Sequence, residues 1–263
     1  MTAPHSSDWL DTLQARGRYH FTMADAVAGL HTSAVATRAS LARLLHRGRI
    51  ASPYRGFYLV LPPEYRALGC LPPEQFVDQL MHHVGEPYYV ALLSAAAFHG
   101  AAHQRPQRFQ VIVARSRKPI HCGAVEVGFI ARKDMARTPT LQRNTPRGHL
   151  RVSTPEATAL ELVGYADRCG GLDQVATVLA ELGDKLTPSS LSQTAGLCPV
   201  AWVQRLGWLL ERVGQTEVAS AMLPLIAAQA PPYAPLVRSA PVAGAAQEPR
   251  WKLILNADVE PDL

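Results

Sequence analysis

The sequence lacks any long apolar run: no window approaches 18 uncharged apolar residues, so no transmembrane helix is predicted. Its four cysteines have no CxxC spacing, so neither a zinc site nor a disulfide framework is indicated, and we expect free, mostly buried thiols. The first residues, MTAPHSSDWLD, lack the basic-then-apolar pattern of a signal peptide. These absences predict a cytoplasmic protein with no membrane partner.

Motifs of known catalytic sites are also missing. The sequence has no Walker A loop, no GxSxG elbow, no GxGxxG after a strand and no SxxK pair. Carboxylates are sparse near its basic segment, so a two-metal nuclease site lacks ligands. His99 and His103 have the i, i+4 spacing of metal ligands, but Gly100 is expected to end the helix between them. We therefore predict no catalytic residue, no metal and no cofactor.

The charge that is present is one-sided. The chain has a formal net charge of +5 and a pI of about 9.2, which favours a polyanionic partner. Residues 1–61 contain seven Arg, no Lys, three Asp and no Glu, a net of +4, which leaves +1 for the rest. This concentration of charge indicates nucleic acid as the partner, although a merely solvated basic face is the alternative.

Residues 21–60 predict a helix-turn-helix followed by a hairpin. Thr22 is suited to cap a first helix that ends near Gly29, and Thr32 or Ser33 to cap a second that ends at Gly48. Residues 49–51 and 57–60 have strand composition, and SPYRG between them has turn composition. Together they predict a winged helix-turn-helix.

The second helix of that motif has two different faces. At 100° per residue, Ala34, Leu41, Leu44 and Leu45 share one side, and small and cationic residues share the other. We expect Arg43 and Arg47 to enter a major groove, Arg38, nearer the packed side, to contact a flanking phosphate, and Arg49 and Arg55 to position the wing. The predicted DNA-binding residues are Thr37, Arg38, Ser40, Arg43, Arg47, Arg49, Tyr54 and Arg55.

Prolines near residues 62 and 72 indicate a boundary, so we predict domains at residues 1–66 and 67–263. The expected fold is α+β: an N-terminal winged helix-turn-helix, then a larger α/β domain with a small mixed sheet and several helices. The expected strands are 109–114, 125–130 and 150–152, with 251–256 returning to the same sheet. The expected helices are 74–84, 88–99, 153–163, 175–182, 189–195 and 200–213, and the helix at 153 has a capping box from Ser153 and Glu156 as well as a Thr154-Pro155 start.

A second basic segment runs from Arg105 to Arg147. It contains ten Lys and Arg, opposed only by Glu126 and Asp134. A second nucleic-acid or phosphate surface and a set of solvated loops are equally good interpretations. The possible second basic surface is formed by Arg105, Arg108, Arg115, Arg117, Lys118, Arg132 and Lys133.

The order of these segments resembles the AbiEi family of abortive-infection antitoxins, which are also transcriptional repressors of type IV toxin-antitoxin systems. The resemblance is carried by RGRIASPYRGFYLV, ALLSAAAFHG, FQVIVARSRKPI, RVSTPEATALELV before Gly170 and Gly171, RLGWLLE and RWKLILN. It implies an N-terminal winged helix that binds inverted repeats in its own promoter, and a C-terminal domain that counteracts a nucleotidyltransferase toxin. The sequence departs from the family in a short acidic tail after WKLILN.

Two alternatives stay open at this point. One is a nucleic-acid-processing enzyme that the winged helix targets, which a cleft of carboxylates or His would indicate. The other is a ligand-responsive regulator, which a closed apolar pocket in the second domain would indicate. The operator, the oligomeric state, the antitoxin surface and direct binding of the toxin are not fixed by the sequence.

Overall fold

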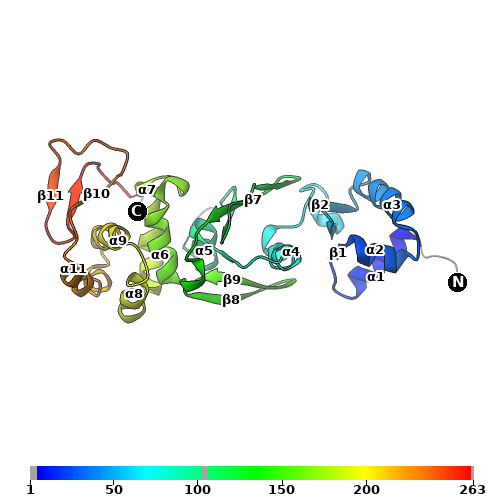
Figure 1. Ribbon diagram of the computed structural model, residues 1–263, viewed down its shortest axis with the longest axis horizontal. Coiled ribbons are helices and arrows are strands. Elements are labelled where there is room, and N and C mark those ends of the chain that lie inside the picture. The colour runs from blue at the N-terminus through cyan, green and yellow to red at the C-terminus, as the bar shows by residue number, and fades with distance from the viewer. Residues whose placement is uncertain (1–4, 102–105, 262–263) are drawn as a thin grey trace. The chain divides into compact units, whose positions relative to one another are not determined.

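A computed structural model describes residues 5–101 and 106–261 and has a mixed α+β fold (Figure 1). The chain divides into two compact units. The first comprises Met1–Tyr88, Gln107–Arg132 and Gln142–Arg151, and the second Tyr89–Pro106, Lys133–Leu141 and Val152–Leu263. The first unit contains residues 5–66 and continues beyond them, so the boundary at residue 66 stays a prediction. None of the helices in the described ranges has the length and apolar character needed to cross a bilayer.

The first unit starts with helices and strands in alternation. The antiparallel sheet of its three strands has the order β1-β3-β2. The elements, in chain order, are α1 (Ser6–Ala15), β1 (His20–Thr22), α2 (Met23–Leu30), α3 (Ala34–His46), β2 (Ile50–Tyr54) and β3 (Phe57–Val60). The two helices and the hairpin predicted from residues 21–60 are therefore present.

Local signals explain where these helices begin. At the start of α2, the Thr22 hydroxyl accepts a hydrogen bond from the Asp25 amide (3.2 Å), and the Asp25 carboxylate accepts one from the Thr22 amide (2.8 Å). This reciprocal pair is a capping box. At the start of α3, the Ser33 hydroxyl accepts from the Ala36 amide (3.2 Å), so Ser33, rather than Thr32, is the cap.

α1 was not predicted, yet it completes the core of the N-terminal segment. It contributes Trp9, Leu10 and Leu13, which pack with Phe21 and Leu41 among other buried side chains. The Trp9 indole covers α2 so closely that a Cβ built on Gly29 would lie 2.1 Å from its ring nitrogen. Three helices and a small sheet thus enclose one apolar core.

The remainder of the first unit contains α4 (Val77–Val84), β5 (Phe109–Val113), β6 (Ile120–Cys122) and β7 (Val125–Ala131). α4 starts later than expected, after a short 3₁₀ turn at Pro73–Gln75. β5 and β7 are parallel neighbours with Val111 opposite Phe129, which confirms that these two predicted strands lie in one sheet. β6 pairs with β7 in the antiparallel sense.

These strands belong to a six-stranded sheet with the order β6-β7-β5-β4-β9-β8. Its other members are β4 (Tyr88–Val90), β8 (Thr140–Thr145) and β9 (Gly148–Ser153). The predicted helix over 88–99 is therefore partly wrong: the chain forms β4, then α5 (Leu92–Phe98), whose first residue, Leu92, has a φ of 54°. A short apolar run has no periodicity that separates a buried strand from a buried helix.

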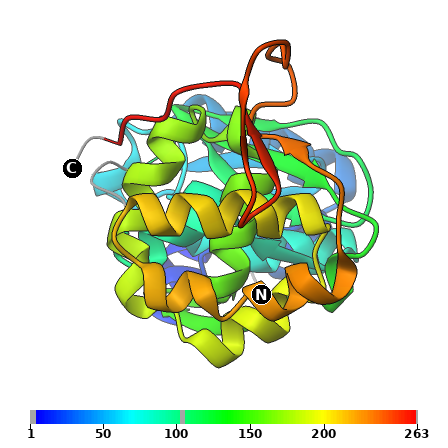
Figure 2. The same cartoon turned by 90° about the vertical axis from the view of Figure 1, so that its left-hand side faces the viewer.

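The second unit is mostly helical. Figure 2 shows these helices together with the small C-terminal sheet, which is coloured orange and red. α6 is completely buried along most of its length and contacts α5, α7, α8 and α9. The helices are α6 (Pro155–Gly164), α7 (Leu172–Leu182), α8 (Pro188–Ala195), α9 (Val200–Arg212), α10 (Thr216–Ser220) and α11 (Leu223–Gln229).

The start of α6 corrects one of its two predicted signals. Thr154 is the cap, since its hydroxyl accepts from the Ala157 amide (3.3 Å), and Pro155 follows it as expected. The Ser153–Glu156 capping box is wrong. The buried Glu156 carboxylate instead accepts hydrogen bonds from the amide and the hydroxyl of Thr187.

The C-terminal strand does not return to the six-stranded sheet, which corrects another expectation. β12 (Leu253–Leu255) pairs with β10 (Ala234–Pro235) and β11 (Ala246–Glu248) in a separate three-stranded sheet. The buried Arg205 of α9 holds this region, because its Nε and Nη2 donate to the Pro235 carbonyl at 3.1 and 2.8 Å. Burial lowers the pKa of this guanidinium to about 10.

Candidate nucleic-acid interface

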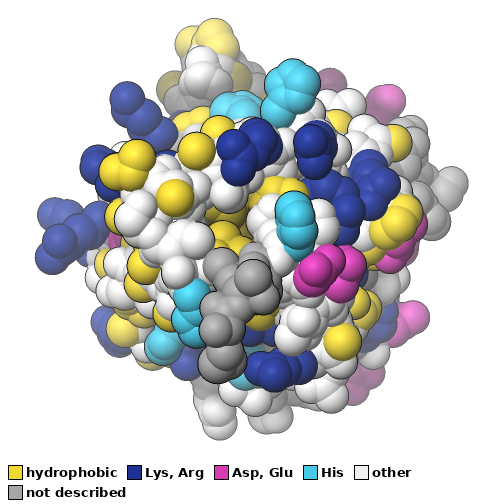
Figure 3. Space-filling model, turned by 90° about the vertical axis from the view of Figure 1, so that its right-hand side faces the viewer, with side chains coloured by type: hydrophobic (Ala, Val, Ile, Leu, Met, Phe, Trp, Pro, Cys, Tyr) yellow, Lys and Arg dark blue, Asp and Glu magenta, His cyan; other side chains and the backbone are white. Residues whose placement is uncertain are grey.

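The outer face of α3 is cationic and open. Figure 3 looks onto the side that carries α1, α2 and α3 and shows Lys and Arg side chains gathered over the upper part of that face. In α3 and at its end, Arg38, Arg43 and Arg47 are all exposed. Within the described residues, none of the three side chains has a salt bridge. Their charges are therefore available to an external anion.

The packed face of α3 differs from the predicted one. Thr37, Leu41 and Leu44 are buried, whereas Leu45 is 39% exposed and Ala34 is exposed. Thr37 was a candidate for DNA contact, but its side chain is fully buried and its hydroxyl lies 2.9 Å from that of Thr32. We therefore exclude Thr37 from the proposed contact surface.

The rotation of the helix also changes the interpretation of Arg38. It was placed near the packed side, but it is exposed and follows the buried Thr37 by one residue. Arg43 donates a hydrogen bond from Nη2 to the Ser40 hydroxyl of the preceding turn (3.0 Å), which orients its guanidinium along the helix surface. Ser40 is half-buried and acts as the acceptor that positions Arg43.

In the hairpin, the candidate residues have different surroundings. Arg55 is exposed at the turn next to Gly56, whose φ of 76° closes the hairpin. Arg49 instead pairs with Asp11 of α1 at 3.2 Å and so fixes the start of β2. Tyr54 is 36% exposed, and its ring centre lies 5.7 Å from the Arg117 guanidinium.

Val35 was missed by the sequence analysis. Its side chain is 73% exposed in the first turn of α3, the largest exposure among the large apolar residues described. A branched apolar side chain at that place is suited to contact the methyl group of thymine. The signal in the sequence was a β-branched residue outside the apolar stripe of the helix.

The described residues of the second basic segment have different surroundings. Arg108 pairs with Glu126 (2.6 Å), Arg132 is buried, and Lys133 is exposed in the second unit. Arg105 lies outside the described residues. The structure does bring together Arg115, Arg117 and Lys118, which line one cleft in the first unit.

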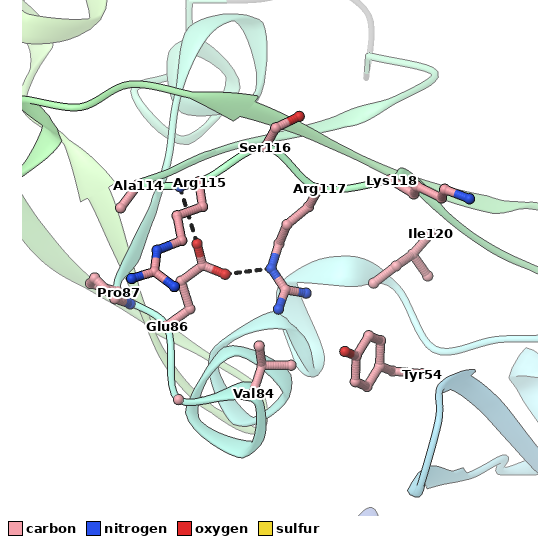
Figure 4. Close-up of a pocket in the computed structure, with 11 residues that line it drawn as sticks. Tyr54, Val84, Glu86, Pro87, Ala114, Arg115, Ser116, Arg117, Lys118 and Ile120 are labelled. Atoms are coloured by element: carbon pink, nitrogen blue, oxygen red, sulfur yellow. Dashed lines mark hydrogen bonds and ion pairs between the residues drawn. The ribbon is translucent and has the colours of Figure 1, made fainter.

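Figure 4 shows this cleft, which has a volume of about 660 Å³. Glu86 lies between Arg115 and Arg117: its carboxylate forms an ion pair with the Arg117 guanidinium and accepts the Arg115 amide at 3.2 Å. Burial would lower the pKa of Arg117, but hydrogen bonds to Glu86 and Tyr54 outweigh it and raise that pKa. This cleft is open and charged and lies in the first unit, so it is not the closed apolar pocket of the second domain that was expected of a ligand-responsive regulator.

A neighbouring cleft is lined by two carboxylates and two His residues: Asp78, Glu86, His82 and His149. Its Asp78 accepts a hydrogen bond from the Tyr88 hydroxyl (2.8 Å) and lies 3.9 Å from His149. Burial, followed by the charge of Asp78, raises the pKa of Tyr88. These carboxylates already have structural partners, and no group of three metal-ligating side chains occurs within residues 5–101 and 106–261.

The other described His and Cys side chains that the sequence analysis considered have structural surroundings. His99 is buried, and its Nε2 donates to the Ser153 carbonyl (2.8 Å), while His103 lies outside the described residues. The expectation of free cysteines is confirmed: Cys70, Cys122 and Cys169 are buried and Cys198 is half-buried. A hydrogen bond between Cys70 and Cys122 raises the pKa of Cys70 and lowers that of Cys122.

Comparisons with known proteins identify a family for part of the chain and a solved structure with a similar fold. Residues 89–212 match the family model described as the AbiEi antitoxin C-terminal domain, which confirms the resemblance for this segment. A crystal structure of the RV2827C protein from Mycobacterium tuberculosis superposes with a TM-score of 0.71 and 16% identity, over 97% of this chain and 95% of that chain. At that identity the likeness shows the fold alone. No curated protein sequence matches.

Proposed function

We propose that this chain, whose residues 89–212 belong to the AbiEi antitoxin family, is a DNA-binding antitoxin that represses its own operon. The order of elements from α1 to β3, with an antiparallel sheet β1-β3-β2, supports a winged helix-turn-helix. In that motif α3 is the recognition helix and the β2–β3 hairpin is the wing. The partner is duplex DNA with an inverted repeat, as the resemblance to the family implies, and two copies would then read two half-sites.

The exposed arginine face of α3 is the observation that carries this proposal. Arg38, Arg43 and Arg47 face solvent, and the sequence contains no Asp or Glu between Asp25 and Glu64. A phosphate backbone that approaches α3 therefore meets no acidic side chain from α3 itself or from the wing. Neutralised phosphates release counterions, and that release supplies much of the affinity of DNA-binding proteins.

Side-chain size on α3 suits close approach to base edges. Ala36, Ala39 and Ala42 are exposed, so little bulk separates the helix backbone from a groove. Arg43 is positioned to donate two hydrogen bonds to a guanine, and Arg55 to contact a phosphate beside the groove. We assign sequence recognition to α3 and orientation on the duplex to the wing.

The family match supports the antitoxin role, and the resemblance of the whole sequence extends it to a nucleotidyltransferase toxin. We propose that the segment from residue 89 onward counteracts this toxin in the cytoplasm and that the chain itself performs no catalysis. The two functions are then separable, because the DNA contacts assigned to α3 and the wing all lie before residue 66.

Footprinting on the DNA upstream of the gene tests the repressor role. We expect two protected half-sites that are lost in Arg43→Ala and retained in Lys133→Ala, a matched loss of one exposed cation. Equal protection of the upstream DNA and of a scrambled duplex would contradict the proposal.

Co-expression with the product of the adjacent reading frame tests the antitoxin role. If that product arrests growth, wild type and Arg43→Ala should both restore growth, because the substitution affects only the DNA-binding function. Failure of both proteins to restore growth, at matched expression, would contradict an antitoxin role.

A further inference from the structure

The cleft beside the wing has the composition of an anion site. It is lined by the turn at Glu86–Pro87, the segment from Ala114 to Lys118, and Tyr54 of β2. Three cationic side chains face one carboxylate, so its net charge is positive. Ligand sites usually have volumes of about 300–1,000 Å³, and this cleft, at about 660 Å³, lies within that range.

The carboxylate in the cleft is already neutralised. Glu86 is paired with the Arg117 guanidinium and also accepts the backbone amide of Arg115. Its side chain is 13% exposed and that of Arg117 is 20% exposed, so this pair forms the inner wall of the cleft. An ion pair held this way leaves the other two cations of the cleft without a competing acceptor.

Those two cations are Arg115 and Lys118. Both are exposed, and neither side chain forms an ion pair within the described part of the chain. Figure 4 shows the Arg115 side chain on one side of Glu86, and Lys118 beyond Arg117 on the other. A guanidinium offers two parallel donors that suit the oxygens of a phosphate group, and an ammonium adds a point charge.

The rim of the cleft is aromatic and apolar. Tyr54 is held between Arg117, 5.7 Å from its ring centre, and His83, whose ring centre lies 6.4 Å away. Val84 and Pro87 add apolar surface. A phosphate-bearing ligand with a planar ring can therefore lie in the positive field between Arg115 and Lys118 and place its ring at the rim beside Tyr54.

We propose that this cleft binds a phosphate group, carried by a ligand of the size of a mononucleotide. The same chemistry can be supplied by a free nucleotide or by a backbone phosphate of DNA that lies along the wing. Because Tyr54 belongs to β2, occupancy of the cleft acts on the wing in either case. The inference is independent of recognition by α3.

Titration with free phosphates is the first arm of the test. The probes are adenosine 5′-monophosphate, pyrophosphate and adenosine, and their binding to the full chain is measured by calorimetry. We expect binding of both phosphates and weaker or absent binding of adenosine. Arg115→Gln and Lys118→Gln should each weaken phosphate binding about tenfold, the worth of one charge-assisted hydrogen bond. Lys133→Gln, which removes an equal charge elsewhere, should leave it unchanged.

The second arm replaces the free phosphates with duplex DNA. If only DNA is bound, the same two variants should reduce the slope of log affinity against log salt by about 0.9 each, and Lys133→Gln should not. That result assigns the phosphate to the DNA backbone.

The proposal is overturned if Arg115→Gln and Lys118→Gln, folded as judged by circular dichroism, behave like wild type in both arms. Arg43→Ala separates this outcome from failure of the repressor role. That variant alters α3 and leaves the cleft intact, so its binding of free phosphate should equal that of wild type.

Discussion

The guanidinium of Arg147 lies 3.4 Å from the centre of the Tyr19 ring. Arg147 follows β8 in the turn to β9, Tyr19 precedes β1, and both belong to the first unit. The Arg147 carbonyl also accepts a hydrogen bond from Gln79 of α4 (3.3 Å). This arginine of the second basic segment thus fixes the β8–β9 turn to the segment before β1 and to α4, and it is not available to DNA.

Loss of this contact should reduce stability. Burial lowers the pKa of Arg147, so its guanidinium is partly desolvated, and a desolvated cation–π contact contributes about 0.5–2 kcal/mol. We expect Arg147→Ala to lower the free energy of unfolding by about that amount, measured by urea denaturation. Lys133→Ala is the exposed control. Identical denaturation curves for Arg147→Ala and wild type would show that the contact contributes nothing.

The capping box of α2 predicts that the stability of the folded protein depends on pH. Burial alone would raise the pKa of Asp25, but hydrogen bonds from Thr22 and Arg18 lower it overall. A carboxyl with a lowered pKa in the folded state stabilises the protein above its unfolded pKa, about 3.9 for Asp. That contribution disappears as the pH falls through the folded value.

Asp25→Asn should therefore lower the melting temperature near neutral pH and have a smaller effect below about pH 4. Thr22→Ala removes the partner hydroxyl and should cost about 0.5–2 kcal/mol. Thermal melts at several pH values check both. A gap between Asp25→Asn and wild type that stays constant with pH would contradict the assigned role of the carboxylate.

Gly207 in α9 provides a test in which two effects oppose each other. Helix propensity favours Ala over Gly by about 1 kcal/mol. If propensity alone decided the outcome, Gly207→Ala would stabilise the folded protein. However, a Cβ at Gly207 would lie 2.2 Å from the ring of Trp251, which is fully buried. Overpacking in a core costs about 1–3 kcal/mol, so we expect Gly207→Ala to destabilise.

Gly196→Ala is the matched control, because its Cβ would meet nothing closer than 3.4 Å. Differential scanning calorimetry compares the two variants. A higher melting temperature for Gly207→Ala than for wild type would mean that the Trp251 ring can move aside at little cost.

Local signals predicted a large part of the fold. Thr22, Ser33 and Thr154 cap helices by accepting hydrogen bonds from amides three residues later, so the sequence contains both partners. β5 and β7 were recognisable because both are rich in β-branched and aromatic residues.

The errors arose where distant contacts decide the structure. α1 has few local signals, and its Trp9 is fixed by packing against Gly29. The pairing of β12 with β10 rather than with the large sheet depends on contacts about 20 residues apart, which composition does not encode.

The same distinction holds for the candidate site. Exposure of Arg43 and Arg47 follows from one-sided charge on a helix, whereas the burial of Thr37 depends on the exact rotation of α3 in its core. The basic cleft requires Glu86 to meet Arg117, 31 residues later, so no sequence spacing announces it.

The most direct test of the central claim, that α3 reads DNA, is an anisotropy titration of the upstream duplex and of a scrambled duplex. It is repeated at salt concentrations from about 50 to about 200 mM. Arg43→Ala should cost about 1–3 kcal/mol on the upstream duplex alone, and Arg55→Ala should weaken both duplexes about equally and reduce the salt slope by about 1. An affinity for the upstream duplex that changes neither with salt nor in Arg43→Ala would contradict the account.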